Sequence, residues 1–166
     1  MIRSLLFFAL ALVVPEIVAA QEQITTFILV RHAERSDEGG GDPDISEDGK
    51  ARAKRLAEAL SKTSIQAIYS TGYKRTKNTV TPLADAKGLK ISIYEALKGE
   101  EIEKMLKDNS GGTIVVSGHS NTIPWTANYL IGKDEFKNFA DDDYGNFLVV
   151  SVLSKGKVTK VTWLTY

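Results

Sequence analysis

Four short apolar segments, separated from one another by stretches with helical features, constrain the fold of this chain most strongly. They lie at residues 26–30, 65–69, 89–94 and 113–116. Strands joined through a helix need a crossover connection, which is how parallel strands are usually linked. Helices are predicted over about 46–62, 74–86 (interrupted by Pro82), 100–107 and 125–131. We therefore expect a three-layer α/β/α fold with a mainly parallel sheet.

Two more strands are predicted at the C-terminal end of the chain. Residues 147–153 and 158–163 are apolar runs joined by Ser154–Lys157, a segment typical of a hairpin turn. They predict an antiparallel edge on the sheet. The chain has 166 residues and shows no internal repeat or linker, which indicates one folded domain.

The first twenty residues have the layout of a secretory signal peptide. Arg3 precedes the apolar run Leu5–Val14, Pro15 and Glu16 end that run, and Val18–Ala20 supplies small residues before Gln21. Ten apolar residues fall short of the roughly 20 that a membrane span needs. We expect residues 1–20 to be removed, leaving residues 21–166 as a periplasmic or secreted domain with no stable membrane span. A buried N-terminal helix is the alternative.

The charge balance limits the class of partner. Twenty-one basic and 21 acidic side chains give a formal net charge of zero, whereas nucleic-acid-binding domains usually carry a basic excess. We therefore expect no nucleic-acid partner. The absence of cysteine is compatible with an oxidising compartment. Net charge gives no indication of the oligomeric state.

Polar side chains follow each predicted strand of the parallel sheet, where ligands bind in open sheets. The segments are Arg31–Glu34, Ser70–Thr76 with Arg75, Glu95, and Ser117–Thr122 with His119. They bring both histidines of the chain, His32 and His119, to one edge. Arginine presents a fork of donors that matches phosphate oxygens, and histidine can act as a nucleophile or as an acid–base group. The edge therefore favours a phosphoryl group as ligand.

Two acidic segments are predicted to be solvated loops. Glu34–Asp48 carries seven acidic residues, one arginine and three consecutive glycines, and it includes Ser46, a plausible helix N-cap. Asp141–Asp143 is the second segment, which could bind a cation weakly.

These segments together resemble the histidine phosphatase superfamily, in the branch that includes phosphoglycerate mutases and small phosphohistidine phosphatases. Phe27–Glu34 is similar to its nucleophile motif, with Ala33 in place of the usual glycine. Ser70–Thr79 resembles its second arginine segment, Gly118–Thr122 its second histidine segment, and Asp44–Ala53 its "LTxxGxxQA" helix start. The acidic loop replaces a phosphate-contacting asparagine of the mutases, and the insertion that caps larger members is absent, which suggests an open site.

The resemblance implies a phosphoglycerate mutase-like fold and a metal-independent phosphomonoesterase that needs no cofactor. His32 would be the nucleophile that forms a phosphohistidine, and Arg31, Arg75 and His119 would surround the phosphoryl oxygens. Glu95 is the expected general acid, with Glu100 and Glu101 as neighbouring alternatives. The expected substrate is an extracytoplasmic sugar phosphate, phosphorylated envelope glycolipid or phosphoprotein.

Two other classes remain open from the sequence. One is a non-catalytic phosphate-binding or sensing module that keeps the same pocket. The other is a metallohydrolase that uses both histidines, although dedicated metal sites usually draw on more ligands.

Overall fold

The computed structural model describes residues 23–156 and 158–166. The expected signal peptide, residues 1–20, lies outside the described residues. The described elements are, in chain order, β1 (Thr25–Arg31), α1 (Glu47–Ala59), β2 (Ala67–Ser70), α2 (Lys74–Lys87), β3 (Ile91–Ile93), α3 (Gly99–Asp108), β4 (Thr113–Gly118), α4 (Thr122–Ile131), β5 (Asn146–Ser154) and β6 (Val158–Thr165).

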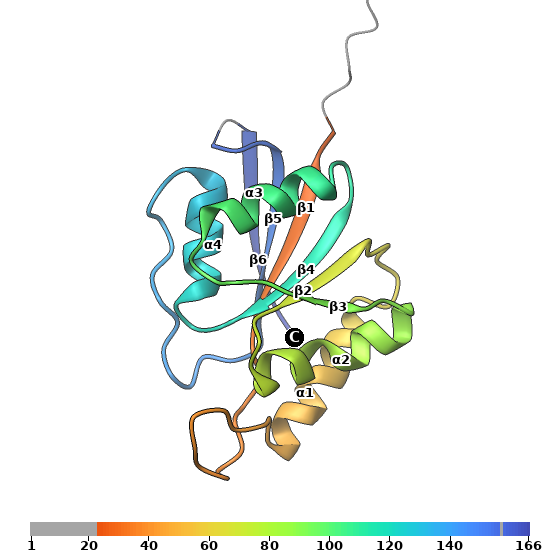
Figure 1. Cartoon of the computed structure of the whole chain (residues 1–166), viewed down its shortest axis with the longest axis vertical. Coiled ribbons are helices and arrows are strands. Elements are labelled where there is room, and N and C mark those ends of the chain that lie inside the picture. Colours follow the sequence, from red (N-terminus) through yellow and green to blue (C-terminus); the bar gives the residue numbers. More distant parts are fainter. Residues whose placement is uncertain (1–22, 157) are drawn as a thin grey trace, which may run out of the picture.

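The strands form one sheet in the order β3-β2-β4-β1-β5-β6 (Figure 1). β3, β2, β4 and β1 pair in parallel, whereas β5 runs antiparallel to both β1 and β6. The expected mainly parallel sheet with an antiparallel C-terminal edge is therefore confirmed. The order places the ends of β1, β4 and β2 side by side, and the residues directly after these ends build the candidate site.

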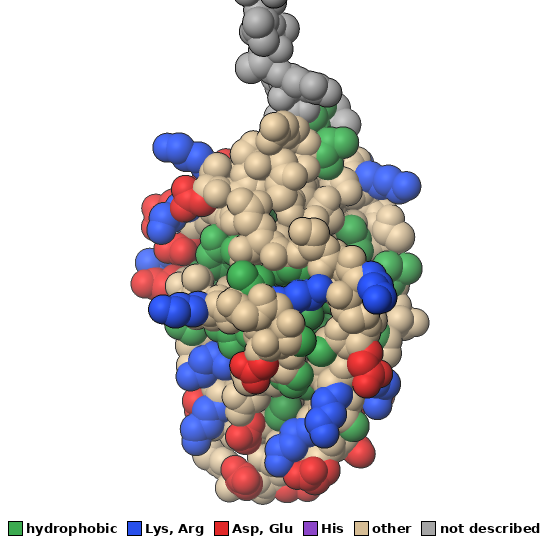
Figure 2. Space-filling view, turned by 90° about the vertical axis from the view of Figure 1, so that its right-hand side faces the viewer, with side chains coloured by type: hydrophobic (Ala, Val, Ile, Leu, Met, Phe, Trp, Pro, Cys, Tyr) green, Lys and Arg blue, Asp and Glu red, His purple; other side chains and the backbone are tan. Residues whose placement is uncertain are grey.

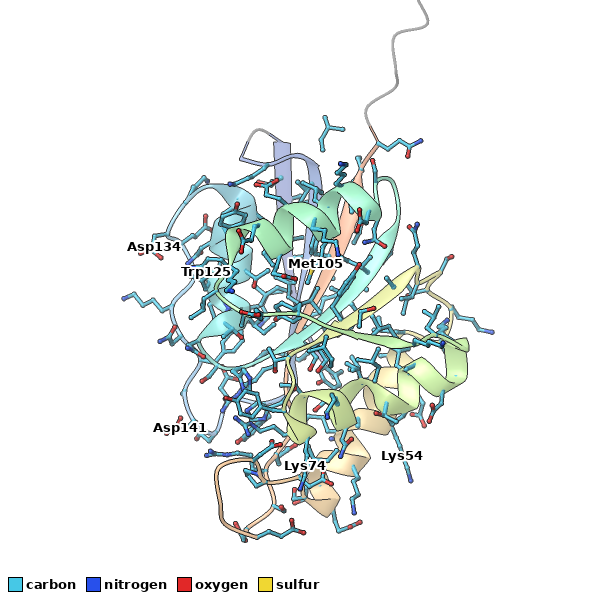
Figure 3. All side chains as sticks on the ribbon, in the orientation of Figure 1. Lys54, Lys74, Met105, Trp125, Asp134 and Asp141 are labelled. Atoms are coloured by element: carbon cyan, nitrogen blue, oxygen red, sulfur yellow. The ribbon has the colours of Figure 1, made fainter. Side chains whose placement is uncertain are left out.

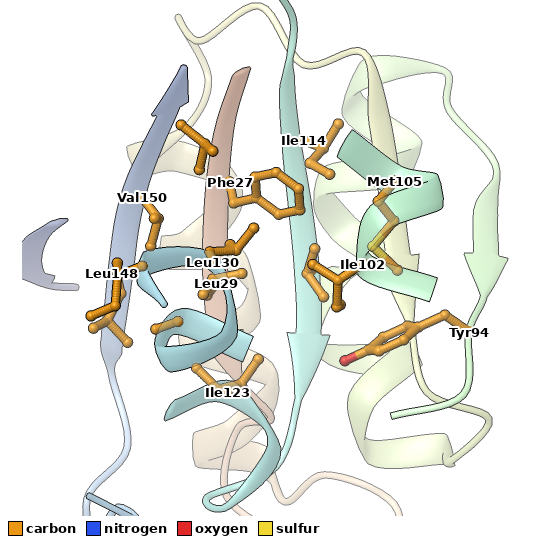
Figure 4. Close-up of a cluster of buried hydrophobic side chains, with 14 of the residues drawn as sticks. Phe27, Leu29, Tyr94, Ile102, Met105, Ile114, Ile123, Leu130, Leu148 and Val150 are labelled. Atoms are coloured by element: carbon orange, nitrogen blue, oxygen red, sulfur yellow. The ribbon is translucent and has the colours of Figure 1, made fainter. Parts of the chain in front are cut away.

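Helices cover both faces of the sheet because side chains of the inner strands alternate between two apolar clusters. Phe27 and Leu29 of β1 pack with α3 and α4, and Figure 4 shows them in this cluster beside Ile102 and Met105. Ile28, the residue between them, packs on the other face with the apolar side chains of α1 and α2. This alternation confirms the three layers.

Helix ends differ from the sequence-based expectation by a few residues. Pro82 does not interrupt α2, which runs through it with one backbone donor fewer. Pro124 lies inside α4 rather than before it, because the N–H groups of a first helical turn need no intrahelical partner. α1 ends at Ala59 instead of about residue 62. Ser46 caps α1 as predicted, since its hydroxyl accepts a hydrogen bond from the amide of Gly49 at 3.1 Å.

Acidic and basic side chains are interspersed on the face of the molecule that Figure 2 shows, with apolar side chains exposed between them. Among residues 23–156 and 158–166, no helix combines the length and the apolar character that a membrane crossing requires.

Candidate active site

His32 follows β1 and is held by its own backbone surroundings. Its amide donates to the carbonyl oxygen of Gly118 at 2.9 Å, which ties the ends of β1 and β4 together. Its Nδ1 lies 2.8 Å from the carbonyl oxygen of Ala33. A carbonyl oxygen can only accept, so Nδ1 carries the proton and Nε2 keeps the lone pair. His32 is buried at 5% exposure, and its Nε2 is the nitrogen with a free lone pair.

Helix α2 holds Ala33, the residue after His32, close to Arg75. The amide of Ala33 donates to Thr79 Oγ1 at 2.8 Å. The Thr79 hydroxyl in turn donates to the carbonyl oxygen of Arg75 at 2.7 Å, one helical turn earlier. A buried threonine therefore fixes the second arginine segment against the nucleophile segment.

His119 follows β4 at a turn that has no room for a side chain at Gly118. A Cβ at Gly118 would lie 2.6 Å from Thr122 Oγ1, the atom that accepts the His119 amide at 2.8 Å. The ring is fixed by Thr71, whose Oγ1 lies 3.0 Å from His119 Nε2. Thr71 Oγ1 also lies 2.9 Å from Thr76 Oγ1, so a short hydroxyl chain supports this imidazole from behind.

The two imidazoles lie next to one another and line the same cavity. Their ring centroids are 5.4 Å apart and the rings meet edge to face at 68°. Burial is the main cause that lowers the pKa of each to about 4, against an ordinary value of 6.5. The neighbouring guanidinium groups of Arg31 and Arg75 lower both values further. Both rings are therefore neutral near pH 7, the state in which an imidazole can attack phosphorus.

Arg31 is buried and holds the loop before β5. Its terminal nitrogens donate to the carbonyl oxygens of Ala140, Asp141 and Asp143 at 2.5, 3.0 and 2.9 Å. The ring of Tyr144 lies 4.2 Å from its guanidinium carbon. The acidic segment expected to be a solvated loop thus contacts Arg31 through its backbone, although the side chains of Asp141 and Asp142 are exposed.

Arg75 is held by an aromatic ring and a carboxylate. Its guanidinium carbon lies 4.4 Å from the centre of the Tyr73 ring, and Nη1 lies 3.5 Å from Asp42 Oδ1. Among the described residues, the buried Nε atoms of Arg75 and Arg31 have no hydrogen-bond partner. Buried donors of this kind are usually satisfied, so these two unpaired atoms are exceptions.

These side chains line an open cavity of about 420 Å³. Its lining residues are Arg31, His32, Arg35, Tyr73, Arg75, Ala96, His119, Ser120, Asn121, Thr122 and Asp141. The structure therefore brings together four of the five residues predicted for the site. Glu95 does not line this cavity, although its neighbour Ala96 does. Its carboxylate is mostly exposed and lies 2.5 Å from Lys98 Nζ.

The acidic loop is anchored at several points instead of being freely solvated. Arg35 and Ile45 form an isolated antiparallel bridge, and Ile45 is buried. The Glu34 carboxylate accepts from Arg52 Nε at 2.8 Å and from Nη2 at 2.5 Å. Burial raises the pKa of Glu34, but its hydrogen bonds and the positive charge of Arg52 outweigh burial and leave the pKa below its ordinary value. Asp42 Oδ1 accepts from the amide of Lys74 at 2.9 Å, so the loop also caps the start of α2.

Sequence reasoning missed two tyrosines that lie beside the histidines, and one of them, Tyr73, lines the cavity. The ring of Tyr73 is perpendicular to that of His119, with centroids 5.0 Å apart, and its position directly after β2 was a usable signal. Tyr144 lies 6.1 Å from the His32 ring but comes from the loop before β5, which no strand-end pattern indicates. In the described part of the chain, no three His, Cys, Asp or Glu side chains gather in an arrangement that could hold a metal ion.

Two comparisons with known sequences each match part of the chain. Residues 27–100 match the family model of the histidine phosphatase superfamily (branch 1). A curated relative, phosphoserine phosphatase 1 of Hydrogenobacter thermophilus, is 46% identical over 70 residues. That stretch is 39% of this chain and 33% of the relative, so the match spans about a third of the relative's length.

Solved structures share the fold over most of the chain. The protein histidine phosphatase SixA, in complex with tungstate, has a TM-score of 0.68 at 12% identity, over 84% of this chain and 96% of that one. The native mycobacterial glucosyl-3-phosphoglycerate phosphatase has a TM-score of 0.66 at 12% identity, over 87% and 99%. The match over residues 27–100 includes the nucleophile and arginine segments, and the fold is shared across both halves of the domain. Over residues 27–100 the chain matches the histidine phosphatase superfamily, and the described domain shares its fold with solved histidine phosphatases.

Proposed function

We propose that this protein is a metal-independent phosphomonoesterase that acts through a phosphohistidine on His32. One observation carries the proposal: two neutral imidazoles 5.4 Å apart share an open cavity with two guanidinium groups. The arginines supply the positive charge that a transferring phosphoryl group needs, and the arrangement needs no metal for that purpose. The phosphatase names of the sequence relative and the structural neighbours support the same class of reaction.

The proposed reaction has two displacements at phosphorus. In the first, His32 Nε2 forms a bond to phosphorus while the ester P–O bond breaks and the leaving oxygen takes up a proton. In the second, water attacks the phosphohistidine and gives a proton back to the group that protonated the leaving oxygen. The P–N bond breaks, and inorganic phosphate leaves with His32 neutral again. Arg31, Arg75 and His119 are proposed to stabilise the charge on the phosphoryl oxygens in both steps.

Two carboxylates near the cavity, those of Glu95 and Asp141, are the candidate proton donors for the leaving group. Glu95 would have to separate from Lys98 before it could turn toward the cavity. Asp141 is the carboxylate-bearing residue among those that line the cavity. A true acid is needed most when the leaving group is a poor one. Comparing Glu95→Gln and Asp141→Asn on p-nitrophenyl phosphate and on an alkyl phosphate identifies the acid, because its variant loses more activity on the alkyl ester.

The basic experiment is hydrolysis of p-nitrophenyl phosphate in the presence of EDTA. We expect turnover by the purified protein and none by His32→Ala. A protein that binds inorganic phosphate but shows no turnover is instead a binding or sensing module of the same fold. Loss of activity in EDTA that added divalent metal restores contradicts the metal-independent mechanism.

We also propose that the protein acts outside the cytoplasm, on a sugar phosphate, a phosphorylated envelope glycolipid or a phosphoprotein. The layout of residues 1–20 supports export. Cell fractionation combined with N-terminal sequencing tests this proposal. We expect mature protein beginning at Gln21 in the periplasm or medium, and full-length protein retained in the cytoplasm contradicts it.

A further inference from the structure

We propose that an open groove next to the catalytic cavity binds the leaving group of the substrate, and that this group is an uncharged, hydroxyl-rich one such as a sugar. The groove has a volume of about 610 Å³. Its lining residues are Leu97, Asn121, Trp125, Asn128, Asp134, Phe136, Lys137 and Asn138. The inference rests on the proposed phosphatase function and adds the substrate class.

The groove adjoins the catalytic cavity. Asn121 lines both, and Ala96 of the cavity is followed directly by Leu97 of the groove. Asn121 is the residue before α4, and Trp125 comes four residues later on the same side of that helix. Side chains at this spacing are about 5–6 Å apart. A ring attached near the phosphate ester oxygen can therefore pass Asn121 and reach Trp125.

Hydrogen bonds of Asn128 fix one wall of the groove. Asn128 Nδ2 donates to Asp134 Oδ1 at 2.9 Å and to the carbonyl oxygen of Phe136 at 2.8 Å. Its Oδ1 accepts the amides of Glu135 and Phe136 at 3.0 and 2.8 Å. One side chain thus fixes the 134–136 segment against α4, and Figure 3 shows Trp125 and Asp134 on this side of the molecule, with Asp141 on the loop after them.

The chemistry of the lining suits a sugar. Trp125 is half-buried, and its ring is stacked on Tyr129 with centroids 5.3 Å apart, which holds the indole in place. Aromatic faces pack against the C–H faces of sugar rings, and amide groups both donate to and accept from hydroxyls. Asn121 and Asn138 are exposed, so their side-chain amides are accessible to a ligand.

The charges of the groove indicate an uncharged ligand. Its acidic and basic residues, Asp134 and Lys137, balance one another, and the Asp134 carboxylate is already bonded to Asn128. The adjoining cavity, in contrast, contains Arg31 and Arg75. The substrate therefore carries its charge at the phosphoryl end and presents a neutral body to the groove.

Leu97 marks the point where cavity and groove meet. It is half exposed and is the one non-glycine residue with a positive φ, 62°, in the described part of the chain. A leucine held in this conformation is strained, and such strain is found most often at ligand sites. It places an apolar side chain at the entrance to the groove.

The test compares a sugar substrate with one too short to reach the groove. We expect Trp125→Ala to lower the ratio of kcat/KM for glucose 6-phosphate to kcat/KM for acetyl phosphate by about 5- to 10-fold, the size of effect expected for one lost aromatic contact. Asn121→Ala should lower the same ratio. Ile24→Ala, which truncates an exposed apolar side chain outside both sites, is the matched control and should leave the ratio unchanged.

A second readout does not depend on turnover. The chain has two tryptophans, so Trp163→Phe leaves Trp125 as the single emitter. In a His32→Ala, Trp163→Phe protein, glucose 6-phosphate should change the emission and inorganic phosphate should not. This readout still tests the groove if no substrate is hydrolysed, an outcome that overturns the proposed function alone.

Two outcomes overturn the groove assignment in an active enzyme. One is an unchanged ratio in Trp125→Ala together with equal emission responses to glucose 6-phosphate and phosphate. The other is a phosphohistidine peptide that is hydrolysed with a higher kcat/KM than glucose 6-phosphate and depends on Trp125, because the groove then serves a polypeptide.

Discussion

The rings of His32 and His119 meet edge to face with their centroids 5.4 Å apart, although the two residues come from the ends of different strands. A backbone hydrogen bond from His32 to Gly118 and the parallel pairing of β1 with β4 fix the two rings at this distance. A shared phosphoryl group requires such proximity, since its contacts are hydrogen bonds of about 3 Å. The two imidazoles are therefore close enough to bind the same phosphoryl group.

Both histidines should titrate far below their ordinary range. Burial lowers the pKa of each to about 4, so both stay neutral through pH 5–8. The chain has two histidines, and two C2–H proton resonances should therefore report the whole titration. We expect both midpoints near pH 4, and a His32 midpoint above about 6 contradicts the buried neutral nucleophile.

The same shifts make stability depend on pH in a defined window. The histidines of the unfolded chain bind protons below about pH 6.5, whereas those of the folded chain resist protonation down to about pH 4. The free energy of unfolding should therefore fall as the pH drops from about 6.5 to about 4. His119→Gln removes one of the two groups, so urea titrations should show a shallower fall for this variant than for the unchanged protein.

Arg75→Ala should lower kcat/KM for p-nitrophenyl phosphate by about 10²–10³, the usual cost of one lost transition-state donor. The Nε of Arg75 is buried without a partner among the described residues, and its guanidinium lies beside His119. Arg75→Lys keeps the charge but loses the fork of donors, so we expect partial activity. Arg55→Ala, an exposed arginine of α1, is the control. Equal effects of Arg75→Ala and Arg55→Ala argue against a role in phosphate binding.

Asp42→Asn should strengthen inhibition by inorganic phosphate several-fold. The Asp42 carboxylate lies 3.5 Å from Arg75 Nη1 and competes with an anion for it. Asparagine keeps an oxygen that can accept the amide of Lys74, so the start of α2 should remain capped. Asp37→Asn removes the same charge from an exposed position in the same loop and should change the inhibition constant little. Identical constants for both variants indicate a long-range charge effect instead.

Gly49→Ala should destabilise the protein by about 1–3 kcal/mol, as forced close contacts in packed regions do. A Cβ at Gly49 would lie 2.6 Å from the carbonyl oxygen of Glu34 and 2.9 Å from Ile45 Cβ. Glu34 is two residues from His32, the proposed nucleophile, so activity should fall as well. Gly41→Ala adds the same methyl group where no atom lies within 4 Å. Thermal unfolding of both variants checks this, and equal midpoints contradict the packing argument.

The sequence was sufficient to predict the layers and the convergence of four site residues. These two predictions depend on the periodicity of apolar residues and on the positions where strands end, which are local properties of the chain. Glu95 shows the limit of this reasoning. β3 is the edge strand, three positions from β1, which puts its end roughly 14 Å from the His32 strand at about 4.8 Å per strand. The Glu95 side chain pairs with Lys98, a local contact that strand order alone does not reveal.

The contacts of the loops were not predictable for a different reason. Arg31 binds backbone carbonyls more than 100 residues away in the chain, and any residue type supplies such an acceptor. The composition of Asp141–Asp143 therefore pointed to solvent, although its backbone faces the site. Similarly, the acidic loop shows no pattern that predicts Asp42 beside Arg75, because the ion pair depends on where the loop crosses α2.

The most direct test of the phosphohistidine mechanism is mass analysis of the protein quenched during turnover of p-nitrophenyl phosphate. We predict one added phosphoryl group, stable in alkali and labile in acid, mapped to the peptide that contains His32 and absent from His32→Ala. An unlabelled protein together with undiminished turnover by His32→Ala would contradict this mechanism.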